Sequence, residues 1–399
     1  MAEFRSVGRV QVSLWGHKVG VLVPSPERGY FAFRFDRSFL ETGIEIAPLM
    51  MPLAEGPYQF TDLPRNAYEG LPPCFADSLP DGFGNSLIRR WARERKYDID
   101  ELPALDKLCY VGNRAMGALC YEPMRGPGGR PTSLDMRGVV EQARKVTNGD
   151  LADLDEPDAL REIIRIGSSA GGAQAKAIVG WNRTTGAFMM GDRDVPEGFE
   201  QWIVKFTPQE FPWRGEREYA TYLKARDAGV EVSESCLYEL DGVKHFMTKR
   251  FDRDGNRRHH LQTLCALRHV GHPSRREEKT YDLLFETAVD LNLGYEALEQ
   301  LFRRMAFNVL IEEVDDHTKN FSFLMKEGGD WELAPAYDLT GCHFSVEDKD
   351  FEAWANPHVL SVNGKTGLIK DEDLLAVAER FGIGTAKRAL REIKEVLGK

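Results

Sequence analysis

An amphipathic helix runs directly into a dense group of polar side chains near residue 315, and this junction limits the folds open to the chain. Apolar residues recur three and four positions apart, which places them on one helical face. They are Leu298, Leu301, Phe302, Met305, Ala306, Val309 and Leu310. The loop from Asp315 to Asn320 then brings together carboxylates, an imidazole, an ammonium and an amide. Because the helix is anchored in a core, its end is held rigidly, and we expect a binding site there.

The spacing within this loop indicates a particular chemistry. Asp315 precedes Asn320 by five residues, as in kinase catalytic loops, where the Asp orients the acceptor hydroxyl and the Asn binds Mg²⁺. Asp338 ends a short apolar run further on, where a second metal-binding Asp is expected. Each residue alone also fits a solvated helix end or turn. Together they favour phosphoryl transfer.

Length, charge and cysteine usage narrow the class of protein. A chain of 399 residues suggests two or three domains. The net charge of −11 argues against a free-standing nucleic-acid binder, so any DNA contact is expected to need a partner. The six cysteines form no Cys-x-x-Cys pair, and neither a signal peptide nor a long apolar span is evident. We therefore expect a cytoplasmic protein that does not enter a membrane.

The order of sequence patterns predicts an α+β protein in three parts. Strand-like alternation with a turn at Gly16 opens the chain, and a Gly- and Pro-rich stretch at Met124–Ser133 indicates a linker. Residues 1–125 are predicted as an N-terminal subdomain, 134–250 as a β-rich lobe and 251–399 as a helical lobe. Helices are expected over Tyr281–Leu291, Tyr295–Val314 and Asp371–Val396.

Two features of the middle part suggest how a ligand could be held. Ile163–Val179 is interpreted as two strand-like runs joined by a small-residue turn, whose glycines leave backbone N–H groups free for phosphate oxygens. It matches neither standard phosphate-loop motif, so a flexible hairpin is the alternative. In a strand, Lys205 shares a face with Ile203 and could enter a cleft, although an exposed strand lysine is the alternative. A helix ending near Gly229 offers Glu218 as a partner for such a lysine.

Several motifs in the same order along most of the chain closely resemble the HipA family of bacterial serine/threonine kinases, the toxins of type II toxin–antitoxin pairs. The motifs are Phe75–Asp81, Val111–Gly117, Ser169–Lys176, Lys205, Arg250–Arg253, Leu261–Thr263, Asp315–Phe321 and Tyr337–Asp338. The resemblance implies a two-lobed protein-kinase-like fold with an extra N-terminal subdomain, and it implies ATP and Mg²⁺ as cofactors.

The resemblance also implies roles for individual residues. Asp315 and Lys205 would be catalytic, and Asn320 and Asp338 would hold Mg²⁺. The ATP-binding positions would be Ser169, Ala170, Gly171, Gly172, Ala173, Gln174, Lys205, Lys249, Arg250, Phe251, His317, Asn320, Tyr337 and Asp338. The residues Lys249 to Phe251 would form the hinge and offer backbone groups to adenine.

Two positions depart from the family pattern or remain ambiguous. Well-known members have Asp-Gly-His in the catalytic loop, whereas Asp316 here adds a carboxylate that would raise a neighbouring pKa or recruit a cation. Autophosphorylation is expected at Ser169 from its offset to Gly172, with Ser168 as the alternative.

The resemblance further implies a helix-turn-helix, HipB-like antitoxin partner, contact with DNA only through that partner, and a protein substrate such as an aminoacyl-tRNA synthetase. Two alternatives remain open. Asp-x-His-x-x-Asn also resembles the loop of phosphatidylinositol kinases, so a lipid or small-molecule kinase is possible, although no basic amphipathic membrane helix supports it. A catalytically silent co-repressor is the other, and the intact set of Asp315, Asn320, Asp338 and Lys205 weighs against it.

Overall fold

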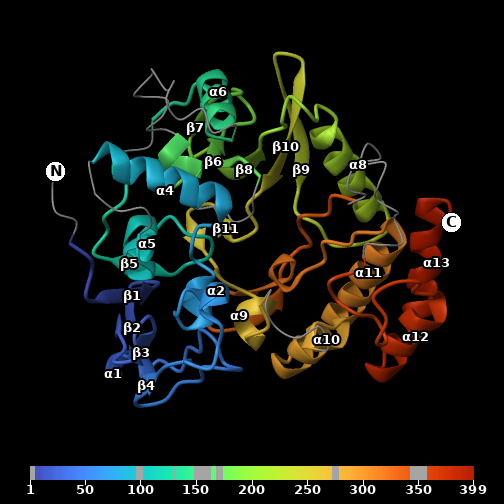
Figure 1. Cartoon of the computed structure of the whole chain (residues 1–399). Coiled ribbons are helices and arrows are strands. Elements are labelled where there is room, and N and C mark those ends of the chain that lie inside the picture. Colours follow the sequence, from blue (N-terminus) through green and yellow to red (C-terminus); the bar gives the residue numbers. More distant parts are fainter. Residues whose placement is uncertain are drawn as a thin grey trace.

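The computed structural model describes residues 5–95, 102–129, 132–147, 163–167, 174–271, 278–341 and 357–399. In Figure 1 the first sheet (blue) and the C-terminal helices (orange to red) lie on opposite sides of the molecule. A second sheet (green to yellow) lies above and between them. The β-rich half therefore precedes a helical half, which is the α+β arrangement predicted.

The N-terminal part is built on an antiparallel sheet with the strand order β4-β3-β2-β1-β5. Its strands are β1 Val10–Leu14, β2 His17–Pro24, β3 Phe31–Phe35, β4 Pro57–Tyr58 and β5 Cys120–Glu122. Val10, Val12 and Leu14 alternate into the core, and Gly16 takes the positive φ of the turn to β2. Short helices surround this sheet: α1 Arg37–Leu40, α2 Arg65–Tyr68, α3 Pro73–Ala76 and α5 Ala104–Val111.

The second sheet has the strand order β7-β6-β8-β10-β9. Its strands are β6 Lys176–Trp181, β7 Phe188–Met190, β8 Glu200–Lys205, β9 Ser235–Leu240 and β10 Val243–Lys249. Asp241 and Gly242, both at positive φ, turn β9 into β10, as the dipeptide predicted. Helix α8 (Arg214–Asp227) packs on β9 and β10.

One hydrophobic core joins this second sheet to helices from earlier in the chain. Helices α4 (Gly82–Glu94) and α6 (Met136–Thr147) contribute to it. Leu87 and Trp91 of α4 share the cluster with Val204 of β8 and Met247 of β10. Side chains from both sides of the Gly- and Pro-rich stretch therefore pack together.

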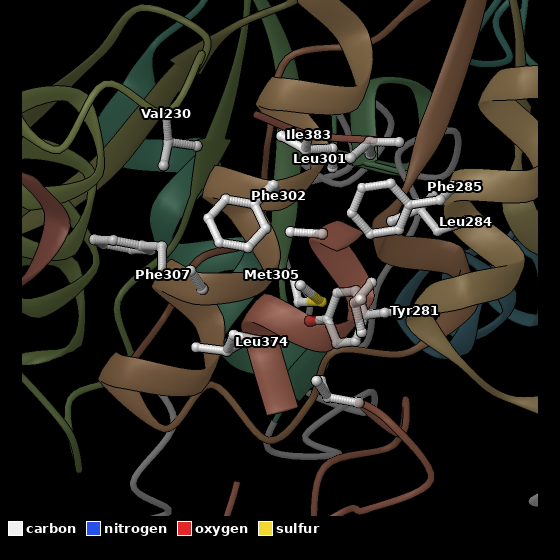
Figure 2. Packing of buried hydrophobic residues seen from close by; sticks show 14 of the residues in the cluster. Val230, Tyr281, Leu284, Phe285, Leu301, Phe302, Met305, Phe307, Leu374 and Ile383 are labelled. Atoms are coloured by element: carbon white, nitrogen blue, oxygen red, sulfur yellow. The ribbon is translucent and has the colours of Figure 1, made fainter. Parts of the chain in front are cut away.

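The C-terminal half is helical around a second large core. Its helices are α9 Leu264–Arg268, α10 Tyr281–Asp290, α11 Tyr295–Ile311, α12 Asp371–Arg380 and α13 Ala386–Leu397. Figure 2 shows Phe302 and Met305 of α11 pointing into this core, with Phe285 and Tyr281 of α10 alongside. The predicted apolar face of α11 thus anchors the helix that leads into the polar loop.

Small strands connect the two halves. The strands β13 His260–Thr263, β14 Ser322–Met325 and β15 Trp331–Leu333 form one sheet, and β11 Arg253–Asp254 pairs with β12 Arg257–Arg258. A 3₁₀ turn, η2, covers Thr318–Asn320. Since β14 begins two residues after Asn320, the polar loop is held between α11 and a strand.

Three predictions of local structure were wrong. The run at 163–167, expected as a strand, is helical. Ile163, Ile164 and Ile166 all pack into one core shared with α4, whereas a strand would point the neighbours Ile163 and Ile164 to opposite faces. The helix expected to reach Val314 ends at Ile311, where Glu312 adopts left-handed geometry. The helix expected over 371–396 is two helices, broken where Gly382 takes a φ of +68°.

Among the residues that the structure describes, no helix is both long enough and apolar enough to cross a lipid bilayer.

Candidate active site

A cavity of about 320 Å³ lies where the second sheet, the hinge and the polar loop meet. This volume is within the range of small-molecule sites. Most of the residues predicted to bind nucleotide line it: Lys205, Lys249, Arg250, Phe251, His317, Asn320, Tyr337 and Asp338. Ile203 lines it together with Lys205, so the strand alternation placed these two side chains correctly.

Lys205 lies at the centre of the charge network in this cavity. Its Nζ is 2.5 Å from Glu218 Oε1 on α8 and 2.5 Å from Asp338 Oδ1. The pairing predicted for Glu218 is therefore confirmed. Burial alone would lower the pKa of Lys205, but the two carboxylates outweigh burial and raise it. The ammonium thus remains charged and fixed between two segments far apart in the chain.

The two carboxylates respond differently to this ammonium. Attraction by Lys205 lowers the pKa of Asp338 well below its usual range. For Glu218, burial is the larger effect and raises the pKa, although Lys205 opposes it. Asp338 also has a φ of 57°, in the left-handed region, which non-glycine residues rarely adopt.

Asp315 lies beside the cavity, with its side chain half exposed. Its backbone carbonyl accepts a hydrogen bond from Asn320 Nδ2 at 2.9 Å, and His317 Nε2 is 3.9 Å from its Oδ1. Partial burial, together with the negative charges of Asp338 and Asp316, raises the pKa of Asp315, while His317 opposes this. A carboxylate in this position is accessible to an acceptor group from outside and can accept its proton.

Tyr337 joins the polar loop to strand β14. Its hydroxyl donates to the carbonyl of Lys319 at 2.6 Å and lies 2.6 Å from Ser322 Oγ. The ring of Phe251 lies 5.5 Å from the ring of Tyr337, measured between centroids. Two aromatic rings therefore form part of the cavity wall next to the hinge.

The hinge residues Lys249 and Arg250 line the cavity, and their charged side chains are paired with carboxylates. The Lys249 ammonium pairs with Glu200, and the Arg250 guanidinium binds Asp252 through contacts of 2.9 and 2.7 Å. The N–H groups of Lys249 and Arg250 donate to the carbonyls of Glu234 and Gln201. Both side chains are thus committed to carboxylates and both of these N–H groups to carbonyls, so contact between adenine and the hinge main chain stays a prediction.

The predicted phosphate-binding loop falls mostly outside the described residues. Ser169, Ala170, Gly171, Gly172 and Ala173, and the alternative Ser168, are in that part of the chain. Gln174 is described, and its Nε2 donates to the Phe206 carbonyl at 3.1 Å. Gln174 is not among the residues that line the cavity, whereas Lys176 is.

The N-terminal part supplies residues to the cavity that the analysis of residue patterns did not assign. Asp77, Asp81 and Met116 all line it. Asp77 accepts hydrogen bonds from the N–H of Thr263 at 2.7 Å and from its hydroxyl at 2.9 Å. Burial raises the pKa of Asp81 to about 6, against the attraction of Lys176. The only sequence signal for the two acids was their place in the Phe75–Asp81 motif.

Asp316 and Glu313, on either side of Asp315, hold the polar loop in place. Glu313 Oε2 accepts hydrogen bonds from the N–H groups of Thr340 at 2.7 Å and Gly341 at 2.8 Å. Asp316 is 1% exposed and points into the protein. The expectation that Asp316 would recruit a cation is not supported by this orientation, although its charge does contribute to the raised pKa of Asp315.

The donor set on this wall fits a magnesium ion bound with phosphate. Asn320 offers an amide oxygen and Asp338 a carboxylate, and Mg²⁺ is typically held by one or two such groups together with phosphates and waters. Within the described ranges no group of three or more His, Cys, Asp or Glu side chains could hold a metal alone.

The chain is similar to known proteins in both its N-terminal and its C-terminal part. Residues 10–122 match the family model described as HipA N-terminal domain, and residues 168–399 match HipA-like C-terminal domain. A Sinorhizobium fredii protein named "Putative kinase Y4dM" is 23% identical, with 97% of this chain and 90% of that protein covered. A Haemophilus influenzae protein named "Putative kinase" is 27% identical over 35% of this chain and 44% of its own length.

A solved structure shares the fold. The HipA chain in the Shewanella oneidensis complex of HipA, HipB and operator DNA aligns with a TM-score of 0.66 at 17% identity, covering 97% of this chain and 90% of that one. The two-lobed, kinase-like α+β fold is confirmed by this match.

Proposed function

The chain belongs to the HipA family, and from this premise we propose that it is an ATP- and Mg²⁺-dependent serine/threonine-protein kinase. The observation that carries the proposal is the position of Lys205, paired with both Glu218 and Asp338 on the wall that also carries Asn320. A lysine paired with a helix glutamate next to a metal-binding aspartate is the arrangement that kinases use for phosphate groups. The curated relatives are also named as kinases.

Each residue has a role that follows from its position. The Lys205 ammonium would bind phosphate oxygens and offset their charge. The half-exposed Asp315 carboxylate would orient the acceptor hydroxyl and accept its proton. Asn320 and Asp338 would hold Mg²⁺, which when bound neutralises charge between the transferred and leaving phosphates. Phe251 and Tyr337 would pack against the base, and main-chain groups of the hinge other than the N–H of Lys249 and that of Arg250 would orient it.

Phosphate transfer can be tested without knowing the acceptor. Wild-type protein is incubated with radiolabelled ATP and Mg²⁺, and label retained on the protein is measured beside an Asp315→Asn variant. We expect incorporation by the wild type and a loss of about two to four orders of magnitude in the variant, since it lacks the proton acceptor. Equal incorporation by both proteins would show that Asp315 is not catalytic, and no transfer by the wild type under any condition would oppose the proposal.

Ser169 is the proposed site of autophosphorylation, with Ser168 as the alternative. A phosphate there would add about −1.5 to −2 charges to a segment that must approach the phosphates of ATP. We expect mass spectrometry after incubation with ATP to find phosphate in this segment, and the modified form to bind ATP more weakly. A modified form that binds ATP as tightly as the unmodified one would exclude the switch.

The proposed context is a cytoplasmic toxin–antitoxin module that arrests growth. Support for a HipB-like helix-turn-helix antitoxin, with DNA contacted only through it, comes from the complex in which the Shewanella HipA chain was solved. A target in translation, such as an aminoacyl-tRNA synthetase, follows from family membership alone. A phosphoproteome taken shortly after induction, compared with one from Asp315→Asn, tests the target.

A further inference from the structure

Asp316 makes a set of hydrogen bonds that the catalytic chemistry does not use. Its Oδ1 accepts the N–H of Val359 at 2.8 Å and that of Leu360 at 3.3 Å. Its Oδ2 accepts the hydroxyl of Tyr281 at 2.9 Å and lies 2.9 Å from His358 Nδ1. One buried carboxylate therefore meets donors from two other segments, and such charge-assisted bonds are the stronger ones.

The donors around Asp316 are themselves held in place. Tyr281 is fully buried at the start of α10, and its hydroxyl accepts a bond from Asn308 Nδ2 of α11 at 3.1 Å. The N–H of Tyr281 donates to the Ser361 carbonyl, and the N–H of Ser361 donates to the Lys279 carbonyl, both at 2.9 Å. The segment 357–362 is thus paired to the residues that lead into α10.

The same segment is anchored again on its far side. Asp373 of α12 accepts from Asn363 Nδ2 at 3.2 Å and from Lys365 Nζ at 2.9 Å. The N–H of His358 donates to the Thr366 carbonyl at 2.8 Å. Asp316 is consequently bonded to a part of the helical lobe that cannot shift without breaking several other contacts.

Asp315 occupies the opposite side of the same backbone turn. Its side chain is half exposed, whereas that of Asp316 is fully enclosed. Because consecutive residues share a peptide plane, fixing the Asp316 side chain limits the directions open to the Asp315 side chain. At Asp315 itself, the bonds from Asn320 Nδ2 and the His317 N–H to the carbonyl oxygen are local to the loop. Bonds to other segments are made further along by Thr318 to the Val270 carbonyl and by the Lys319 carbonyl to Tyr337.

We infer that Asp316 is a positioning residue, which ties the catalytic loop to segment 357–362 and so sets the direction of the Asp315 carboxylate. This rests on the proposed kinase function. A displacement of a reacting group by about 1 Å costs on the order of a hundredfold in rate, so the anchor should affect turnover more than nucleotide binding. Asp316 does not line the cavity that contains Lys205 and Asp338.

The test uses Asp316→Asn, which keeps the shape of the side chain but places an NH₂ group opposite either the Tyr281 and His358 donors or the two backbone N–H groups. The matched control is Asp330→Asn, the same charge change at an exposed turn. We expect Asp316→Asn to lower kcat for phosphate incorporation by about a hundredfold while the KM for ATP stays within about twofold. Asp330→Asn should leave both unchanged.

Hydrogen exchange supplies a readout that does not depend on turnover. In Asp316→Asn we expect faster exchange at the amides of Val359 and Leu360 and also at those of His317 and Asn320. Faster exchange confined to Val359 and Leu360 would overturn the positioning role. So would an unchanged kcat, or a fall in kcat matched by an equal loss of ATP binding.

A second variant keeps the proposal testable if Asp316→Asn does not fold. Tyr281→Phe removes one donor and leaves the others, so it should show a smaller change in kcat and exchange in the same direction. If wild-type protein transfers no phosphate, the proposed function fails, and the exchange rates of the loop still decide whether Asp316 anchors it.

Discussion

Replacing Lys205 by methionine removes the ammonium that lies between Glu218 and Asp338 and keeps a side chain of similar length. The Lys205 side chain is 10% exposed and that of Glu218 is 8% exposed, whereas that of Asp338 is 37% exposed. After the substitution Asp338 can be hydrated, but Glu218 remains enclosed. The cost therefore comes mainly from one buried carboxylate without its partner.

The size of this cost follows from burial. Removing one partner of a buried ion pair costs about 3–5 kcal/mol, because a charge is left without compensation. Burial already raises the pKa of Glu218, so this group can take up a proton and relieve part of the cost near neutral pH. We therefore expect the free energy of unfolding to fall by about 3 kcal/mol at pH 8 and by less at pH 6.

A second substitution separates stability from chemistry. In Lys205→Met with Glu218→Leu both charges are gone, and well-packed apolar replacements of buried pairs are often neutral or stabilising. The double variant should regain most of the lost stability, to within about 1 kcal/mol of the wild type. Phosphate incorporation should remain lost in both variants, since neither has the ammonium.

Urea unfolding at pH 6 and pH 8, followed by circular dichroism, measures these differences as shifts of the midpoint at constant slope. If Lys205→Met unfolds at the wild-type midpoint at both pH values, Glu218 is not buried against Lys205 as described. If the double variant transfers phosphate at the wild-type rate, Lys205 has no part in the reaction.

Three further predictions follow from the site and the core. At an ATP–Mg²⁺ concentration a hundred times Kd, the free energy of unfolding of the wild type should rise by about 2.7 kcal/mol. Asp338→Asn should abolish this rise, and Asn is chosen because it tolerates the positive φ at this position; an equal rise in both proteins would exclude Asp338 as a ligand. Asp315→Asn should change the free energy of unfolding, measured in urea, by less than about 0.5 kcal/mol, because the side chain is half exposed; a larger loss would assign it a structural role. Burial lowers the pKa values of His245, His260 and His269 to about 4 each, so between pH 6.5 and 4 these three rings bind more protons in the unfolded state and their contribution to the free energy of unfolding should fall as pH falls. Buried carboxyls with raised pKa values, such as Asp81 and Glu218, act in the opposite direction, so the check is an NMR titration of the rings themselves, and a ring that titrates near 6.5 would contradict its burial.

Local patterns in the sequence were enough to predict the parts of the site that depend on one element. Strand alternation placed Lys205 on the same face as Ile203, and helix periodicity anchored α11 ahead of the polar loop. The partner of Lys205 was found as well, because a glutamate on the following helix is close in sequence as well as in space. These rules depend only on the periods of strands and helices.

At 163–167 the local pattern predicted a strand, and the prediction was wrong. A run of β-branched residues favours a strand when judged alone. Here Ile163, Ile164 and Ile166 all pack into one core with α4 and the second sheet. A helix can turn all three toward that core, whereas a strand would leave one of the neighbours Ile163 and Ile164 outside it, at a cost of about 1.5–3 kcal/mol in lost burial.

The sequence alone determined the order of elements, the polar loop and the face on which Lys205 lies. Only the tertiary structure decided that Asp77 and Asp81 of the N-terminal part line the same cavity, and that Asp316 turns inward while Asp315 stays accessible. Asp77 meets Thr263 across 186 residues of chain, and Asp316 meets Val359 across 43. Contacts at such separations depend on how whole elements pack, and no local period of side chains carries that information.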